Sequence, residues 1–400
     1  MSVLESAPRR AGTPHGGHRG DVEGLRAVAI GLVLLFHAGV PFAGGGLVGV
    51  DAFFVVSGFL ITGLLLREVR RTGTLALPAF YARRARRIVP SAAAVLLAAL
   101  AATALLAPER LAPTAAAVLA AALQVANWFL LTGGAQALDP QLAHTPVTHF
   151  WSLAVEEQFY LAWPLLVLLV ARRAQRRGGD VRRGLLVALT ALTVLSLATS
   201  VLVSPRAELL AYLGTGTRAW QFGVGGLLAL LAPELARAAR RPALLRAGGW
   251  AGAVLLPTSA VWAGAVTYPG WAALVPTLAT AAVIASGAAG PGAGVGRLLS
   301  LPPVRWVGRL SYTWYLWHVP ATWIAVELAP GLDRWPFLLL VELLAAAPAL
   351  ATSLLVERPL RHGRAVASTR AGLLLGALAT ALVVLGALLA LSAALLALSA

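Results

Sequence analysis

The chain has 400 residues, of which 59% are hydrophobic and only 12% are charged. A water-soluble fold cannot bury that much apolar side chain, and the continuous apolar runs exclude an outer-membrane barrel, whose strands alternate apolar and polar residues. The sequence therefore predicts an all-α fold, a polytopic transmembrane helix bundle. The chain has no cysteine, which excludes disulfides, thiolate metal sites and a cysteine nucleophile.

The formal net charge is +16, and all 32 basic residues are arginine. Cytoplasmic loops of membrane proteins are enriched in basic residues, so the arginine-rich stretches predict which loops share the cytoplasmic side. Nucleic-acid binding explains this charge less well, because no soluble basic domain is present. The polar start of the chain lacks a signal-peptide cleavage site, so we expect residues 1–20 to be a cytoplasmic segment before an uncleaved first span.

Twelve apolar runs are long enough to be candidate spans. In chain order they are Val22–Val40, Leu47–Leu66, Ile88–Ala107, Pro113–Leu131, Phe150–Val170, Gly184–Val203, Tyr212–Ala232, Trp250–Val266, Ala273–Gly290, Trp306–Val326, Pro336–Val356 and Leu373–Ala400. Five arginine-rich loops between them are expected in the cytoplasm, and this requires an odd number of crossings between Arg87 and Phe150. We therefore expect the polar-interrupted run Pro113–Leu131 not to span. About eleven spans remain, with the N-terminus cytoplasmic and the C-terminus extracytoplasmic.

The first span carries Arg26 and His37, which are eleven residues apart. This spacing puts both side chains on one helix face, roughly 16 Å apart along the axis. It predicts Arg26 near one membrane surface and His37 well inside the hydrocarbon, where an imidazole is costly and needs a reason. A buried base in line with a fixed cation suits an anionic carrier that docks at the surface and delivers a group inward.

The second span has Asp51 in its first turn. A carboxylate there is placed to orient the His37 imidazole through its second nitrogen, and the alternative is that it only caps the helix. Ser57 and Gly58 follow on the same span. Such small residues more often form a close-packing notch than supply a nucleophile.

The string FYARRARRIVP, from Phe80 to Pro90, lies between the second and third spans. Arg83, Arg84 and Arg87 belong to its guanidinium cluster. Guanidinium is the preferred partner of phosphate oxygens, although a simple cytoplasmic anchor explains the charge equally well.

Adjacent carboxylates, Glu156 and Glu157, follow in the string HFWSLAVEEQFYLAWP. Neighbours on a helix point about 100° apart, so we expect one to face the bundle and the other the interface. Trp151 and Tyr160 belong either to an aromatic belt or to a surface that stacks on a sugar ring.

A second mid-membrane histidine, His318, is predicted roughly 13 Å along the span that begins after Arg305 and Arg309. It is either a packing residue or a second catalytic group. No sequence motif supports zinc binding, so we expect no metal.

Seven strings together resemble acyltransferase family 3, a family of integral membrane proteins that modify surface polysaccharides, peptidoglycan, lipid-linked sugars and some antibiotics. They are LRAVAIGLVLLFH, GVDAFFVVSGFLI, FYARRARRIVP, HFWSLAVEEQFY, RAWQFGVGGLLA, RLSYTWYLWHVP and LLVERPLR, and they occur in the family's order. The resemblance implies a ten-helix acyltransferase core over 21–362, to which 371–400 adds a C-terminal helix. Many relatives continue into an extracytoplasmic SGNH domain, and we expect this chain to act without one.

The resemblance places the family's arginine–histidine element on Arg26 and His37. It places the cytoplasmic arginine motif on Arg83, Arg84 and Arg87, and the acidic motif on Glu156 and Glu157. The expected enzyme is an O-acyltransferase of the bacterial plasma membrane. It would move an acetyl or other short acyl group from cytoplasmic acyl-CoA to a hydroxyl of a carbohydrate, a glycolipid, or a glycosylated or macrolide metabolite.

The implied site divides into three groups of residues. The expected catalytic residues are His37 as general base, with Asp51 or Glu156 orienting or reprotonating it. Arg26, Arg83, Arg84 and Arg87 are expected to bind the nucleotide end of acyl-CoA, with acetyl-CoA as the expected co-substrate. The expected acceptor contacts are Trp151, Glu157, Tyr160 and His318.

Several alternatives stay open at this stage. Transfer is either direct or through a covalent acyl-histidine, and the protein is either a monomer or a homodimer. The competing function is a membrane transporter or flippase of an acylated or anionic small molecule. No nucleic-acid partner is expected.

Overall fold

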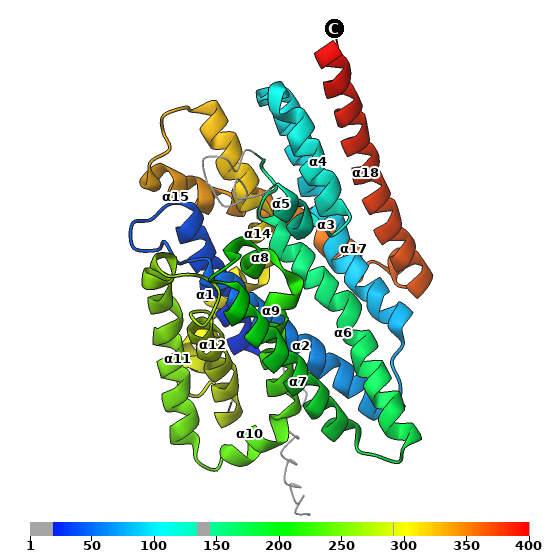
Figure 1. Ribbon diagram of the computed structural model, residues 1–400, viewed down its shortest axis with the longest axis vertical. Coiled ribbons are helices and arrows are strands. Elements are labelled where there is room, and N and C mark those ends of the chain that lie inside the picture. The colour runs from blue at the N-terminus through cyan, green and yellow to red at the C-terminus, as the bar shows by residue number, and fades with distance from the viewer. Residues whose placement is uncertain (1–18, 134–144, 291, 400) are drawn as a thin grey trace, which may run out of the picture.

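The computed structural model describes residues 19–133, 145–290 and 292–399, and every regular element in those ranges is helical. The all-α class expected from composition is therefore confirmed. Nearly all of the polar segment 1–20 lies outside the described residues. Figure 1 shows a helix bundle in which α1 and α2 lie near the middle and α18 stands at one edge.

The bounds of the helices follow the apolar runs, but several expected spans are divided or extended. The first half of the chain forms α1 Gly20–His37, α2 Val48–Thr72, α3 Leu77–Leu106, α4 Leu111–Ala122, α5 Ala126–Thr132, α6 Phe150–Arg176, α7 Val181–Val203, α8 Glu208–Leu213 and α9 Thr215–Leu230. The second half forms α10 Ala232–Ala238, α11 Pro242–Trp262, α12 Leu274–Ser286, α13 Val295–Leu299, α14 Pro302–Leu328, α15 Trp335–Leu344, α16 Ala346–Thr352, α17 Arg358–His362 and α18 Thr369–Ser399. A π-helical stretch, Ser353–Glu357, joins α16 to α17.

Helix α3 begins eleven residues earlier than the apolar pattern predicts, so the arginine motif lies on a helix and not in a loop. A proline in its first turn favours this start, and arginine is a good helix former. At 1.5 Å per residue a helix of this length measures about 45 Å, which exceeds the roughly 30 Å hydrocarbon core. The helix can therefore carry guanidinium groups beyond the hydrocarbon and still cross it.

The run Pro113–Leu131 is divided between α4 and α5, which have 12 and 7 residues. The break between α4 and α5 contains Gln124, whose φ of 59° lies in the left-handed region that a continuing helix excludes. Each piece is too short for a bilayer crossing, which needs about 20 residues. The structure thus agrees with the expectation that this run does not form a single span.

Among the described residues, six helical segments are long and apolar enough to cross a membrane, one of them the segment Trp335–His362 that contains α15, α16 and α17. The number is seven if the bent pair α9 and α10 forms one span. The exact number of about eleven spans stays a prediction, because some expected spans are broken. One example is the run 212–232, which Gly214 divides into α8 and α9.

The arginine-rich turns gather at one end of the bundle. Figure 1 shows the α2–α3 connection, the α6–α7 turn and α10 toward its lower end, the C-terminus at its top, and the α1–α2 loop at the left edge above the three arginine-rich turns. These three turns lie on one side, as the arginine distribution predicts. Which end faces the cytoplasm stays a prediction.

Two glycines bring α2 and α9 into backbone contact. A Cβ atom built at Gly58 would lie 2.0 Å from the carbonyl oxygen of Phe222, and one at Gly225 would lie 2.0 Å from that of Val55. No larger residue fits at either position without separating the helices. Of the two readings of Ser57 and Gly58, the close-packing notch is therefore confirmed for Gly58.

The final helix, α18, packs along α3 and α4. Figure 1 shows it as the outermost element on that side of the bundle. Its contacts are apolar, and they include the buried side chains of Val383 and Ala387.

Candidate active site

Helix α1 carries both Arg26 and His37, and their depth in the membrane stays a prediction. Because α1 begins at Gly20, Arg26 lies roughly 9 Å into the helix at 1.5 Å per residue, and His37 is its last residue. The polar start of the helix is held by ion pairs inside the bundle, including one of 2.9 Å between Glu23 and Arg305.

The His37 ring is oriented by its own helix. Its Nδ1 lies 3.0 Å from the carbonyl oxygen of Val33, one turn earlier. A carbonyl only accepts, so Nδ1 carries the proton, and Nε2 of the neutral ring is left as the basic nitrogen. No carboxylate is needed to fix this tautomer.

Two further histidines pack against this ring, and we call His37, His149 and His318 the histidine cluster. Ring centroids are 4.8 Å apart for His37 and His318, and 4.9 Å apart for His149 and His318. His318 is completely buried, and one of its nitrogens bonds the Tyr315 carbonyl at 2.5 Å. The other nitrogen has no partner within the described structure.

His149 is 3% exposed and contacts His318. It is the first residue before α6, a position that an apolar pattern cannot assign. Within the described ranges, no three His, Asp or Glu side chains are arranged to hold a metal ion.

A cavity of about 290 Å³, which we call the inner cavity, runs beside α2 below the histidine cluster. Its wall follows α2 from Val50 to Arg67, a rise of roughly 26 Å at 1.5 Å per residue. At its upper limit lie Ser152 and Tyr315, whose hydroxyl oxygens are 2.5 Å apart. The Tyr315 ring also lies 5.0 Å from that of His318, so this residue separates the cavity from the histidines.

Both acidic residues of the α6 motif line the inner cavity, which corrects the expectation that one faces the interface. Ser57 and Tyr160 donate hydrogen bonds to the Glu156 carboxylate. Glu157 is close enough to Arg84 for electrostatic attraction. The two carboxylates share the cavity because α2 and α3 flank α6, and only the tertiary packing defines that.

Arginines Arg26, Arg84 and Arg87 line the inner cavity, as a phosphate-binding role requires. Arg84 lies over the Tyr160 ring, 3.8 Å from its centroid. Arg83 differs, because it is exposed and pairs with Glu68 at 3.5 Å. It lines neither this cavity nor its neighbour, so its expected place in the donor site is corrected.

A second cavity of about 440 Å³, which we call the arginine vestibule, adjoins the first. The two share Arg26, Arg87 and Tyr312 in their walls. The sequence interpretation did not assign its other basic residues to the site. They are Arg309, Arg358, Arg361 and His362.

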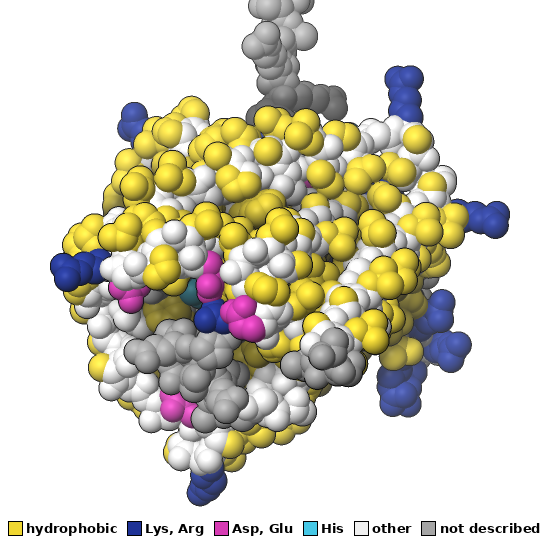
Figure 2. All heavy atoms as spheres, turned by 90° about the horizontal axis from the view of Figure 1, so that it is seen from above, with side chains coloured by type: hydrophobic (Ala, Val, Ile, Leu, Met, Phe, Trp, Pro, Cys, Tyr) yellow, Lys and Arg dark blue, Asp and Glu magenta, His cyan; other side chains and the backbone are white. Residues whose placement is uncertain are grey.

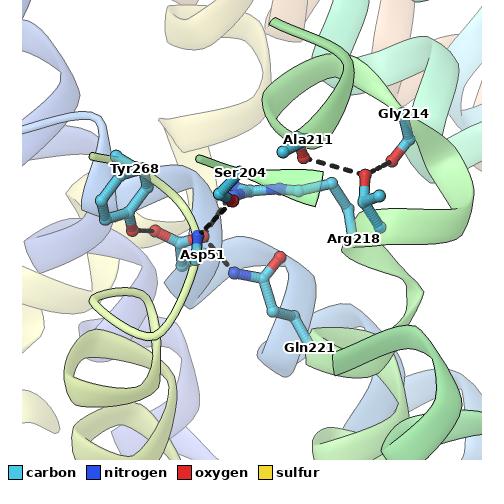
Figure 3. A network of polar contacts seen from close by, with 9 residues as sticks. Asp51, Ser204, Ala211, Gly214, Arg218, Gln221 and Tyr268 are labelled. Carbon is cyan, nitrogen blue, oxygen red and sulfur yellow. Dashed lines mark hydrogen bonds and ion pairs between the residues drawn. The ribbon is translucent and has the colours of Figure 1, made fainter. Parts of the chain in front are cut away.

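Asp51 does not contact His37. Its buried carboxylate accepts hydrogen bonds from Arg218 at 2.6 Å, from Gln221 and from the Tyr268 hydroxyl, and Figure 3 shows the three donors converging on it. Asp51 and Arg218 are both 0% exposed. This buried ion pair joins α2 to α9, so the expectation that Asp51 orients His37 is wrong.

Glu156 is also separated from the histidine cluster. It lies seven residues after His149 on α6, roughly 10 Å along the axis at 1.5 Å per residue. Its hydrogen-bond donors in the described structure are the Ser57 and Tyr160 hydroxyls, and none of these bonds reaches His37.

The aromatic residues expected to stack on an acceptor are divided by the structure. Trp151 is buried and stacks on Tyr212 at 4.7 Å, so its ring is enclosed by protein. Tyr160 lines the inner cavity at the level of Glu156.

The histidine cluster is approached from the upper end of the bundle. His37 is the partly exposed member, whereas His149 and His318 are buried. Seen from that end, Figure 2 shows a hollow with a histidine side chain at its floor and charged side chains around it. A reacting group could thus meet the histidines from above and a second group from the inner cavity below.

The comparisons with known proteins agree with the motif order. A family model described as an acyltransferase domain matches residues 19–358. The chain is 30% identical over 308 residues to the O-acetyltransferase OatA of Staphylococcus aureus, covering 75% of this chain and 50% of the relative. It is 30% identical over 311 residues to the peptidoglycan O-acetyltransferase OatA of Listeria monocytogenes, covering 75% and 49%. The chain thus spans about half the length of these curated relatives, and no solved structure matches it.

Proposed function

Because this chain belongs to acyltransferase family 3, we propose that it is a multi-pass membrane O-acyltransferase of the bacterial plasma membrane. The main support for this proposal is the inner cavity, which extends from a group of arginines to the lower side of the histidine cluster. A donor with phosphates at one end and a reactive acyl group at the other fits that polarity. The proposed donor is acyl-CoA, with acetyl-CoA as the simplest case.

The proposed chemistry is direct transfer to a hydroxyl. The His37 Nε2 accepts the proton of the acceptor hydroxyl, and the oxygen attacks the carbonyl carbon of the thioester. The new C–O bond forms the ester while the C–S bond breaks, and the departing thiolate takes the proton from His37. The Val33 carbonyl supports this role because it fixes the reactive tautomer and stabilises the cationic ring.

The hydrogen bond between Ser152 and Tyr315 lies between the inner cavity and His37, so it must open for the acyl group to pass. Glu156, with the hydroxyls of Ser57 and Tyr160, offers polar partners along the cavity for the amides of a pantetheine arm. These residues therefore bind the donor in our proposal, and Asp51 stabilises the bundle.

The proposed acceptor is a hydroxyl of an extracytoplasmic carbohydrate, glycolipid or glycosylated metabolite. Support comes from the relatives, one of which is named as a peptidoglycan O-acetyltransferase. It also comes from the partial exposure of His37 at the end of α1. The upper end is then the extracytoplasmic side, with the C-terminus there.

Purified protein incubated with radiolabelled acetyl-CoA tests this function. We expect slow hydrolysis without an acceptor and ester formation when a carbohydrate acceptor is added. His37→Ala should lower turnover by about 10²–10⁴-fold, the usual contribution of a general base, and should leave acyl-CoA binding unchanged. A transporter would bind the donor and release it intact, so unaltered acetyl-CoA in both proteins would contradict the proposal.

A further inference from the structure

We propose that the arginine vestibule is a separate subsite for the 3′-phosphoadenosine end of the donor, which restricts the enzyme to nucleotide-bearing thioesters. This inference rests on the proposed function and adds to it a choice between donor classes. Acyl groups reach enzymes either on coenzyme A or on the phosphopantetheine arm of a carrier protein. The carrier arm has a single phosphate, whereas coenzyme A has a diphosphate, an adenosine and a 3′-phosphate.

The first observation is the size and position of the vestibule. It measures about 440 Å³ and lies beyond the arginines at the lower end of the inner cavity. That volume falls within the roughly 300–1,000 Å³ of ordinary small-molecule sites. A phosphopantetheine arm would occupy only the inner cavity, so a second chamber continuous with it calls for a longer ligand.

The second observation is the excess of positive charge at the junction, although Glu156 and Glu357 lie near enough to Arg26 to attract it. Arg26 and Arg87 line both cavities, and no hydrogen bond or ion pair joins either to another described residue. Arg87 is near enough to Arg26, Arg84 and Arg361 to be repelled by their like charges. Partly buried guanidinium groups held together in this way attract a multivalent anion. The diphosphate of coenzyme A fits this junction.

The third observation is the rest of the vestibule wall. Arg309, Arg358 and Arg361 add positive charge, against which the wall has Glu23 and Glu357. The glutamates pair at 3.4 Å with Arg309 and at 3.5 Å with Arg361, both weak, partly exposed contacts. Arg358 is exposed and has no such pair among the described residues. Glu357 is itself buried, but Arg309, Arg358 and Arg361 are exposed, so an incoming phosphate can reach these guanidinium groups from the vestibule.

The fourth observation is an aromatic surface beside these charges. Trp306 lines the vestibule and is 42% exposed. An indole face next to guanidinium groups is the arrangement that stacks on a nucleobase while a phosphate is held. We assign the adenine to Trp306 and the 3′-phosphate to Arg358 and Arg361.

The test compares three donors: acetyl-CoA, acetyl-dephospho-CoA, which lacks only the 3′-phosphate, and S-acetyl-4′-phosphopantetheine, which lacks the nucleotide. For the wild type we expect the KM to rise at least tenfold at each truncation, as loss of a charged hydrogen bond typically causes. The variants are Arg358→Ala/Arg361→Ala and Trp306→Ala. Arg364→Ala is the matched control, because Arg364 is exposed three residues away and lines neither cavity.

The double arginine variant should raise the KM for acetyl-CoA at least tenfold and leave that for acetyl-phosphopantetheine within twofold of wild type. Turnover of the truncated donor then also shows that the variant is folded. Equal KM values for all three donors in the wild type, or equal losses for every donor in the variant, would overturn the subsite.

Calorimetric binding of adenosine 3′,5′-bisphosphate separates this inference from the proposed function. Binding that the double variant weakens at least tenfold supports the subsite even if no acyl transfer is detected. Transfer from acetyl-CoA with no binding of the bisphosphate would preserve the proposed function and refute the subsite.

Discussion

The buried pair of Asp51 and Arg218 allows a direct decision between a structural and a catalytic aspartate. Asp51 has three donors around it, whereas Nε and Nη1 of Arg218 have no partner in the described structure. Replacing Arg218 with Met keeps much of the volume and leaves the carboxylate with Gln221 and Tyr268. Replacing Asp51 with Asn leaves a guanidinium group unpaired at a site with no solvent exposure.

Removing one partner of a buried ion pair costs about 3–5 kcal/mol, because the remaining charge stays desolvated. The destabilisation by Asp51→Asn should be near the larger of these two values, since Arg218 has only this carboxylate as a described ion-pair partner. The destabilisation by Arg218→Met should be near the smaller value, since Asp51 retains two hydrogen-bond donors. The double variant should be less destabilised than the sum of the two single variants by at least about 1 kcal/mol, a coupling typical of residues in contact.

Unfolding in detergent, followed by the fluorescence of the 12 tryptophans, measures these differences. Acetyl transfer per folded molecule is measured on the same samples, and we expect it to stay within about tenfold of wild type. The reasoning is refuted if Asp51→Asn unfolds like the wild type but loses the activity that His37→Ala loses. That result would return Asp51 to the catalytic site.

Three further predictions concern the arginines, the packing and the topology. Arg84→Ala should raise the KM for acetyl-CoA about tenfold, because a charged contact is lost. Arg83 lies outside both cavities, so Arg83→Ala should leave this KM unchanged. Equal KM values for the two variants would contradict the assignment of Arg84 to the donor site. Gly58→Ala should reduce the yield of folded protein, because the new Cβ would lie 2.0 Å from the Phe222 carbonyl oxygen. Gly31→Ala should be neutral or stabilising, because no atom lies within 4 Å of a Cβ at that position. Similar yields for the two variants would mean that α2 and α9 can separate freely. The chain has no native cysteine, so single cysteines can report which side of the membrane a loop faces. In intact cells an impermeant thiol reagent should label Phe42→Cys in the α1–α2 loop but not Gly178→Cys in the α6–α7 turn. The reverse labelling pattern would invert the direction of acyl transfer.

Local patterns in the sequence were sufficient for much of the fold and for part of the site. Apolar periodicity located α1, α2, α6, α7 and α14 within a few residues, because each is a continuous helix whose hydropathy is a property of its own residues. The 1.5 Å rise also related Arg26 to His37 correctly along one helix. Breaks such as that at Gly214 were missed, since a short apolar helix after a turn has the same composition as one continuous span.

The contacts between helices could not be predicted from local apolar patterns. The sequence marked Asp51 as a charge that needs a partner, but Arg218 is 167 residues further along the chain, and no local spacing connects them. The same holds for His149, which meets His318 only because α6 starts beside α14. The sequence by itself determined an all-helical membrane protein and which residue types are costly to bury. Only the tertiary structure decided which of those residues lie together, because partners such as Asp51 and Arg218, or His149 and His318, come from different helices.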